Sequence, residues 1–168
     1  MRALAHTDPL TGLPNRRSLS DALAQALLGA STDRMLTVYL IDVDEFKPVN
    51  DTYGHDAGDA LWVEISRRLQ ANVCSGDIVA RLGSDEFVVL ANGLRNAAQA
   101  SGLGNQLLAL FDAPLTILQR EVRIRLTIGY AMAPIDGKEA SSISKLADAA
   151  MCEGKQSGKR CLRRHHFV

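Results

Sequence analysis

Apolar residues recur at every third or fourth position in four segments of the chain, the spacing of a helix with one buried face. In the first segment, residues 16–28, leucines recur every fourth position from Leu19 to Leu27. The second segment follows a predicted loop. We infer this loop from Gly54 and Gly58, because glycine favours turns over helix interiors. The other three predicted helices are residues 61–73, 97–111 and 143–151.

Between these segments the apolar residues form short runs or alternate with polar residues, as in β-strands. Residues 36–43 are too few for a typical helix and predict a buried strand that carries Asp42 and Asp44 at its end. The other predicted strands are residues 78–80 and 87–90, which flank a turn at residues 83–85, a long strand over residues 122–132 and an edge strand within residues 161–168.

The predicted order is helix, strand, helix, hairpin, helix, strand, helix, strand. Hairpins mixed with helices indicate the α+β class, with a largely antiparallel sheet covered by helices. The chain has 168 residues, 46% of them hydrophobic, which suits one domain with one sizeable core. We therefore expect residues 1–168 to form a single domain.

Charge and cysteine content exclude several classes of function. The 19 basic and 19 acidic residues cancel, so we expect no attraction to nucleic acid or to an anionic membrane. The three cysteines lack the paired spacings of a zinc site and fit a reducing, cytoplasmic compartment. No apolar stretch approaches the ~20 residues of a membrane span, so we expect no membrane segment in this chain.

Two groups of acidic residues are candidates for chemistry. Asp42 and Asp44 are two positions apart on a strand, so their side chains share one face and can approach the same cation. A polar loop follows, and a solvated loop with helix N-caps remains an alternative reading of it. Asp85 and Glu86 lie between a Gly-Ser pair and an apolar strand, where an ordinary tight turn is also possible.

Basic residues gather near the C-terminus in GKQSGKR, which contains Lys155 and Lys159. The segment is not a phosphate-binding P-loop, because it lacks the required first glycine and ends a helix instead of following a strand. Cations at a helix C-terminus also complement the helix dipole, which needs no ligand.

Five segments in one order resemble the GGDEF domains, the bacterial diguanylate cyclases. They are DPLTGLPNRR (residues 8–17), DVDEFKPVNDTYGHDAGD (42–59), RLGSDEF (81–87), IGYAMAPIDG (128–137) and ADAAMCEGKQSGKR (147–160). The resemblance spans essentially the whole chain. It implies a nucleotidyl-cyclase or palm-like (ferredoxin-like) fold, with a largely antiparallel central sheet flanked by helices and a signature β-hairpin.

The resemblance also implies a reaction, in which two GTP molecules condense into cyclic di-GMP with release of pyrophosphate. Each domain of this kind holds one GTP, so a second GGDEF domain has to face the first and a monomer is expected to be inactive. The implied cofactor is Mg²⁺ or Mn²⁺, because hard cations bind carboxylate and carbonyl oxygens.

Matching the motifs assigns roles to residues of this chain. The metal would lie on Asp42, the Val43 backbone and Asp85, and the guanine base on Asn50 and Asp59. The phosphates would bind Glu45, Phe46, Lys47, Lys155 and Lys159. The catalytic hairpin would comprise Gly83, Ser84, Asp85 and Glu86, with Asp85 or Glu86 helping to deprotonate the attacking 3′-hydroxyl.

The chain departs from the family pattern at four places. Ser84 replaces the second glycine of the signature, where a Cβ can clash with a nucleotide or strain a turn with positive φ. Lys159 replaces an arginine and loses its bidentate fork, and Cys152 replaces a tyrosine. The product-inhibition motif would fall on Cys74 to Asp77, where the aspartate is present and the arginine is absent.

These observations leave two classes of function open. One is an active diguanylate cyclase whose rate Ser84 lowers. The other is an impaired, GTP-binding or dimerising regulatory module that controls a neighbouring domain such as an EAL phosphodiesterase. The resemblance to GGDEF halves of tandem proteins suggests a domain excised from a longer signalling protein with a linked sensor or EAL domain, and a membrane anchor elsewhere in that protein is compatible with it.

Overall fold

The computed structural model describes residues 6–44, 54–158 and 161–164. Its helices are α1 (Arg16–Leu28), α3 (His55–Ala71), α4 (Ala97–Ala109) and α5 (Ala140–Gln156). Its strands are β1 (Met35–Asp44), β2 (Ile78–Arg81), β3 (Glu86–Leu94), β4 (Leu115–Ile117), β5 (Arg120–Val122), β6 (Arg125–Ala133) and β7 (Leu162–Arg164).

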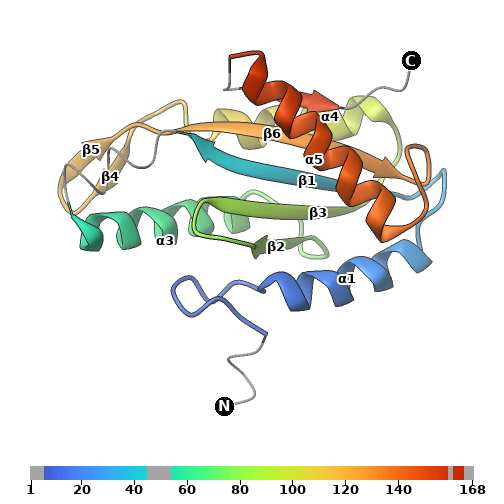
Figure 1. Ribbon diagram of the computed structural model, residues 1–168, viewed down its shortest axis with the longest axis horizontal. Helices are drawn as coiled ribbons and strands as arrows, with labels where there is room; N and C mark the ends of the chain where they lie inside the picture. The colour runs from blue at the N-terminus through green and yellow to red at the C-terminus, as the bar shows by residue number, and fades with distance from the viewer. Residues whose placement is uncertain (1–5, 45–53, 159–160, 165–168) are drawn as a thin grey trace.

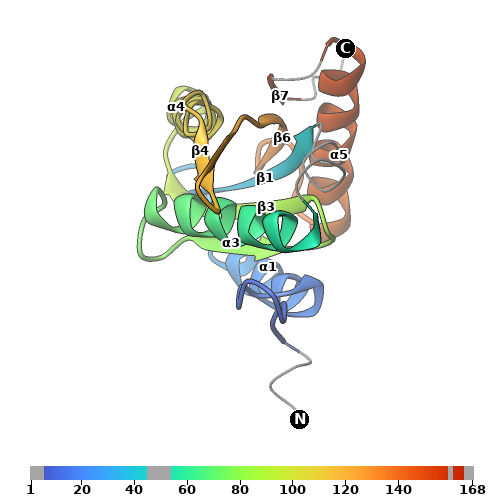
Figure 2. The same ribbon diagram turned by 90° about the vertical axis from the view of Figure 1, so that its left-hand side faces the viewer.

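Five strands form the central sheet, in the order β2-β3-β1-β6-β7. The pairs are antiparallel up to β6, and β7 joins β6 in parallel. Helices α1 and α5 pack on one face of the sheet, and α3 and α4 pack on the other (Figures 1 and 2). This arrangement confirms the predicted α+β class and its largely antiparallel sheet flanked by helices.

Strand β1 lies in the middle of the sheet, and all ten of its residues are buried. Its side chains alternate, so that Ile41 packs toward α3 and α4 while Leu40 packs toward α1 and α5. The same alternation turns Asp42 and Asp44 toward the α1 and α5 face. The strand therefore delivers two acids to the side of the sheet on which α5 ends.

The predicted loop before the second helix is shorter than expected. Gly54 has a φ of +88° and precedes the first residue of α3, whereas Gly58 lies inside the helix and is buried. Ala57 is buried as well and begins the apolar face that continues to Leu61 and Ile65. The prediction that Gly58 belongs to the loop was wrong because Ala57 is the first member of the periodic pattern.

The predicted long strand over residues 122–132 is divided into β5 and β6, with residues 123–124 between them. The inward alternation of Val122, Ile124 and Leu126 continues across the break, so the pattern does not reveal it. Strand β4 pairs with β5 around a two-residue turn at Leu118 and Gln119, whose φ angles are 48° and 69°. Such turns usually carry asparagine or glycine. Because this turn has neither residue, the sequence did not predict the hairpin.

The ends of the predicted helices shift by a few residues. Helices α3 and α4 end two residues before the predicted limits, and α5 extends beyond residues 143–151 at both ends. The predicted edge strand is present as β7, while residues 165–168 lie outside the described part of the chain. No helix within the described ranges is long and apolar enough to cross a membrane.

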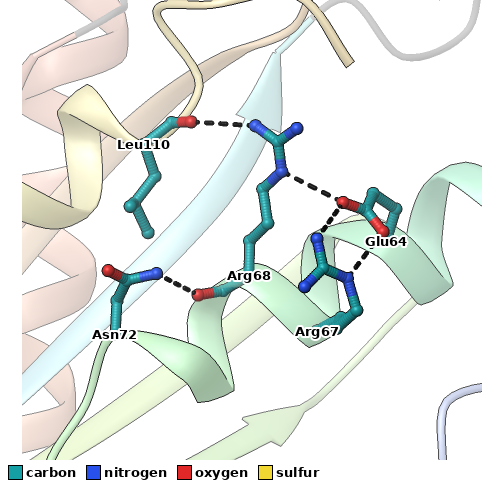
Figure 3. Close-up of polar contacts among 5 residues, drawn as sticks. All are labelled: Glu64, Arg67, Arg68, Asn72 and Leu110. Atoms are coloured by element: carbon teal, nitrogen blue, oxygen red, sulfur yellow. Dashed lines mark hydrogen bonds and ion pairs between the residues drawn. The ribbon is translucent and has the colours of Figure 1, made fainter. Parts of the chain in front are cut away.

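Glu64 on α3 accepts hydrogen bonds from two arginines (Figure 3). Arg67 approaches it with Nη2 at 2.6 Å, and Arg68 with Nε at 3.1 Å. Arg68 also donates to the Leu110 carbonyl and lies over the Phe111 ring, which connects α3 to the end of α4. Despite some burial, the two arginines hold the pKa of Glu64 at about 2.

We expect this cluster to make stability depend on pH below about 4.5. The pKa of Glu64 is lower in the folded chain than the ordinary value of 4.5, so its contribution to stability is complete above that value and disappears as the pH falls toward about 2. Because the side chain is 24% exposed, solvent screening reduces the contribution to about 1 kcal/mol. Urea unfolding should show that Glu64→Gln is less stable than wild type by this amount at pH 7, and a difference that does not shrink at pH 3 would contradict the assignment.

Candidate functional site

Two buried carboxylates and one lysine form the centre of the candidate site. Asp42 and Asp44 are 9% and 3% exposed. The ammonium of Lys155, near the end of α5, forms an ion pair with Asp42 and lies 3.2 Å from Asp44 Oδ1. The other oxygen of Asp44 accepts a hydrogen bond of 2.7 Å from the Thr127 hydroxyl on β6. The structure therefore brings together one predicted metal ligand, its neighbouring acid and one predicted phosphate ligand.

The electrostatics of this centre favour protons and cations. Burial, helped by the nearby Asp85 and Asp44, raises the pKa of Asp42 although Lys155 opposes the shift. Burial and then the charge of Asp42 raise the pKa of Glu86. Burial alone would lower the pKa of Lys155, but Asp42 and Asp44 raise it on balance. Positive charge is thus stabilised beside these acids, and the Lys155 ammonium supplies it in this structure.

The signature turn between β2 and β3 lies beside these acids, as the motif predicted. Glu86 is the register partner of Asp42 across the β1 and β3 pair. The Val43 amide donates to the Asp85 carbonyl at 3.1 Å, and the Leu82 amide donates to the Glu86 carbonyl at 2.9 Å. These backbone bonds fix the turn relative to the end of β1.

Ser84 is exposed in this turn. Leu118 and Gln119 are the non-glycine residues with positive φ in the described part of the chain, so Ser84 does not have the strained backbone that the sequence analysis allowed for. Gly83 is exposed too, and a Cβ there would meet no atom within 4 Å. Backbone strain at Ser84 is therefore excluded in this structure.

Arg81 connects the turn to the N-terminal segment. Its guanidinium donates to Asp8 Oδ2 at 3.1 Å and to the Ser84 carbonyl at 2.8 Å, and it lies 5.5 Å from the centre of the Trp62 ring. Burial favours the neutral form of Asp8, but hydrogen bonds from Thr11 and Arg81 hold its pKa below the usual value. Sequence reasoning assigned no role to Arg81, although it precedes the signature and Asp8 opens the first motif.

Of the remaining predicted site residues, the structure describes only some. Asp59 is exposed in the first turns of α3. The predicted guanine ligand Asn50 and the predicted phosphate ligands Glu45, Phe46, Lys47 and Lys159 lie outside the described residues. Their roles stay predictions.

The degenerate product-inhibition motif has a structural use. Asp77 accepts hydrogen bonds from the backbone amides of Cys74 and Asn92, each at 3.0 Å. Asn92 in turn donates through its side chain to the Gly76 carbonyl at 3.1 Å. One carboxylate oxygen of Asp77 thus closes the turn between α3 and β2, and the other joins that turn to Asn92 on β3.

The donor set suits a divalent cation in its chemistry but is not complete. Asp42 and Asp44 offer hard oxygen ligands, and an ammonium already lies between them as a stand-in cation. In the parts of the chain that the structure describes, no three His, Cys, Asp or Glu side chains lie close enough together to hold a metal ion. A metal would therefore need further oxygens, from the backbone, from the turn or from a bound phosphate.

Comparison with known proteins agrees with this geometry. The family model "Diguanylate cyclase, GGDEF domain" matches residues 5–161. The bifunctional diguanylate cyclase/cyclic di-GMP phosphodiesterase MucR of Pseudomonas aeruginosa is 45% identical over 93% of this chain and 23% of MucR. The cyclic di-GMP phosphodiesterase PdeR of Escherichia coli is 36% identical over 95% of this chain and 24% of PdeR. The chain thus spans about a quarter of these relatives.

Solved structures give the same result for the fold. The GGDEF domain of TpbB from Pseudomonas aeruginosa has a TM-score of 0.89 at 37% identity, covering 94% of this chain and 93% of that one. A sensory box/GGDEF family protein from Caulobacter crescentus has a TM-score of 0.84 at 40% identity, covering 91% and 99%. With the acids, the lysine and the signature turn arranged as described, the chain belongs to the GGDEF family of diguanylate cyclase domains.

Proposed function

We propose that this chain is a diguanylate cyclase domain that condenses two GTP molecules into cyclic di-GMP and two pyrophosphates, with Mg²⁺ or Mn²⁺, across a dimer of GGDEF domains. The observation that carries the proposal is the pair of buried acids, Asp42 and Asp44, beside both the signature turn and Lys155. The relatives named as diguanylate cyclases support the same activity.

The proposed chemistry is an in-line phosphoryl transfer. The 3′-oxygen of one GTP attacks the α-phosphorus of the other, the bond between the α-phosphorus and the bridging oxygen breaks, and pyrophosphate leaves. A second transfer in the opposite sense closes the ring. A divalent cation on Asp42 and Asp85 would offset the negative charge of the phosphates.

Residues of the chain would supply the remaining steps. Glu86, or Asp85 beside it, would accept the proton of the 3′-hydroxyl, and the raised pKa of Glu86 suits such a base. Asn50 and Asp59 would bind the guanine edge. The backbone of Glu45 and Phe46, together with the lysines 47, 155 and 159, would bind phosphates.

A regulatory role is the second candidate, and two observations favour it. Ser84 departs from the signature, and PdeR, a relative named as a phosphodiesterase, contains a matching segment. In this version the domain would bind GTP or dimerise and control a linked EAL or sensor domain in a longer cytoplasmic or membrane-anchored protein.

Product analysis distinguishes the two functions. The chain, fused to a leucine zipper so that dimerisation does not limit the rate, should convert GTP to cyclic di-GMP in the presence of Mg²⁺ and not of EDTA. Chromatography would identify the product, with ATP as the control substrate. GTP binding without product would favour the regulatory module, and no preference for GTP over ATP would contradict both.

Replacing Ser84 with glycine should raise the rate of the zipper-fused protein. With backbone strain excluded, the gain comes from relief of crowding against the nucleotide, and a cost of about 1 kcal/mol corresponds to about a five-fold change in rate. Initial rates of pyrophosphate release measure it. The exposed position predicts little change in stability, so Ser84→Gly and wild type should have similar urea midpoints. An unchanged rate in an active pair would show that the serine is tolerated.

A further inference from the structure

Helix α5 rests on the sheet (Figure 1), and this packing holds Lys155 close to Asp42 and Asp44. Two glycines allow the close approach. A Cβ at Gly129 would lie 2.2 Å from the Met151 backbone nitrogen, and a Cβ at Gly154 would lie 2.9 Å from Thr127 Cγ2. Because neither glycine carries a side chain, the end of α5 lies directly on β6. The neighbouring Lys155 therefore reaches Asp42 and Asp44 with its ammonium.

This position conflicts with the role of Lys155 as a phosphate ligand. The ammonium lies between Asp42, which the proposed reaction assigns to the metal, and the neighbouring Asp44. An ammonium and a divalent cation cannot share that place, since like charges a few ångströms apart repel strongly in a partly buried site. Metal entry therefore requires Lys155 to leave.

Removal of Lys155 without a replacement would be costly. Asp42 and Asp44 are buried beside each other, so without Lys155 they need another cation or a proton to offset their charge. Lysine suits an exchangeable partner because its charge is carried on a flexible four-carbon chain. Its side chain is 33% exposed, which leaves room for it to swing outward.

We infer that Lys155 is an internal counter-ion of the metal site, which neutralises Asp42 and Asp44 in the empty domain and is displaced by the divalent cation. The displaced ammonium is then free to bind the triphosphate. This inference rests on the proposed function. It makes the binding of metal and of GTP mutually reinforcing, because GTP offers Lys155 a new anionic partner and the metal releases Lys155 to reach it.

The first test compares Lys155→Met with wild type in nucleotide-free Mn²⁺ binding, measured from the electron paramagnetic resonance signal of free Mn²⁺. Without the competing ammonium, the variant should bind Mn²⁺ at least about ten-fold more tightly. Its affinity for GTP with Mg²⁺ should fall, because a phosphate ligand is lost. Lys145→Met is the matched control, since Lys145 is exposed on the same helix, and it should change neither affinity.

Equal or weaker Mn²⁺ binding by Lys155→Met would overturn the inference while leaving the proposed function intact, provided that wild type binds GTP with Mg²⁺. If wild type binds neither Mn²⁺ nor GTP, the inference and the proposed function both fail.

A second test uses wild type alone and does not depend on a variant that folds. In carbon-proton NMR spectra, the two ε-protons of an immobilised lysine give separate signals. Those of Lys155 should be separate without metal and merge when Mg²⁺ is added, whereas the Lys145 signals should stay unchanged. Persistence of the separate Lys155 signals at saturating Mg²⁺ would refute the displacement.

Discussion

Asp42→Asn should abolish metal-dependent GTP binding and lower cyclisation by about a hundred-fold or more. The substitution keeps the size of the side chain and removes a charge that is buried at the end of β1 and shared with Lys155. Calorimetric titration with GTP, in Mg²⁺ and in EDTA, measures the binding. The two titrations should differ for wild type and coincide for the variant.

Asp56→Asn is the matched control for this experiment. Asp56 lies in the first turn of α3, is exposed and follows the same polar loop in the sequence. It should leave binding and rate nearly unchanged. Equal losses in Asp42→Asn and Asp56→Asn would mean that the acids of this region act through the fold and not through a cation.

Arg81→Ala should destabilise the domain by about 3–5 kcal/mol, the range for removal of one partner of a buried ion pair. The Arg81 side chain is 7% exposed, and its loss would leave Asp8 and the Ser84 carbonyl without their guanidinium. Urea unfolding at pH 7 measures the change. The cyclisation rate should fall further than the folded fraction does, because the signature turn loses a contact that holds its position.

Arg95→Ala, at an exposed position, is the control and should change stability by less than about 0.5 kcal/mol. A double-mutant cycle with Asp8→Asn measures the coupling energy between Asp8 and Arg81 separately from the contacts of Arg81 with Ser84 and Trp62. The double variant should be more stable than the sum of the single effects predicts, since neither charge is then left alone. Strict additivity would show that Asp8 and Arg81 act independently.

The fold was predictable where burial is periodic. The helices and the strands of the central sheet follow from the spacing of apolar residues, and β1 follows from a short run rich in apolar and β-forming residues. The β4 and β5 hairpin was not predictable, because Leu118 and Gln119 adopt positive φ without the residues that usually announce such a turn. The parallel pairing of β7 was equally hidden, since a short edge strand carries no sign of its direction.

The site was predictable in its acids and less so in its cations. Asp42, Asp44 and the signature turn stand out because acids at the end of an apolar strand need an explanation. The pairing of Lys155 with Asp44 joins residues 111 positions apart, and Lys155 alone looks like a residue that complements the helix dipole. Arg81 was missed for the same reason, since its partner Asp8 lies 73 positions away.

The central position of β1 also sets which parts of the site can move. With hydrogen bonds to β3 and β6 on both sides and all ten residues buried, its amides should exchange with deuterium only when the whole domain opens. Lys155 lies instead in the last turn of α5 and carries its charge at the end of a flexible four-carbon chain. The anions of the site are thus fixed to the central strand and its cation to a long side chain, so the charge that can rearrange on the timescale of ligand entry is the positive one.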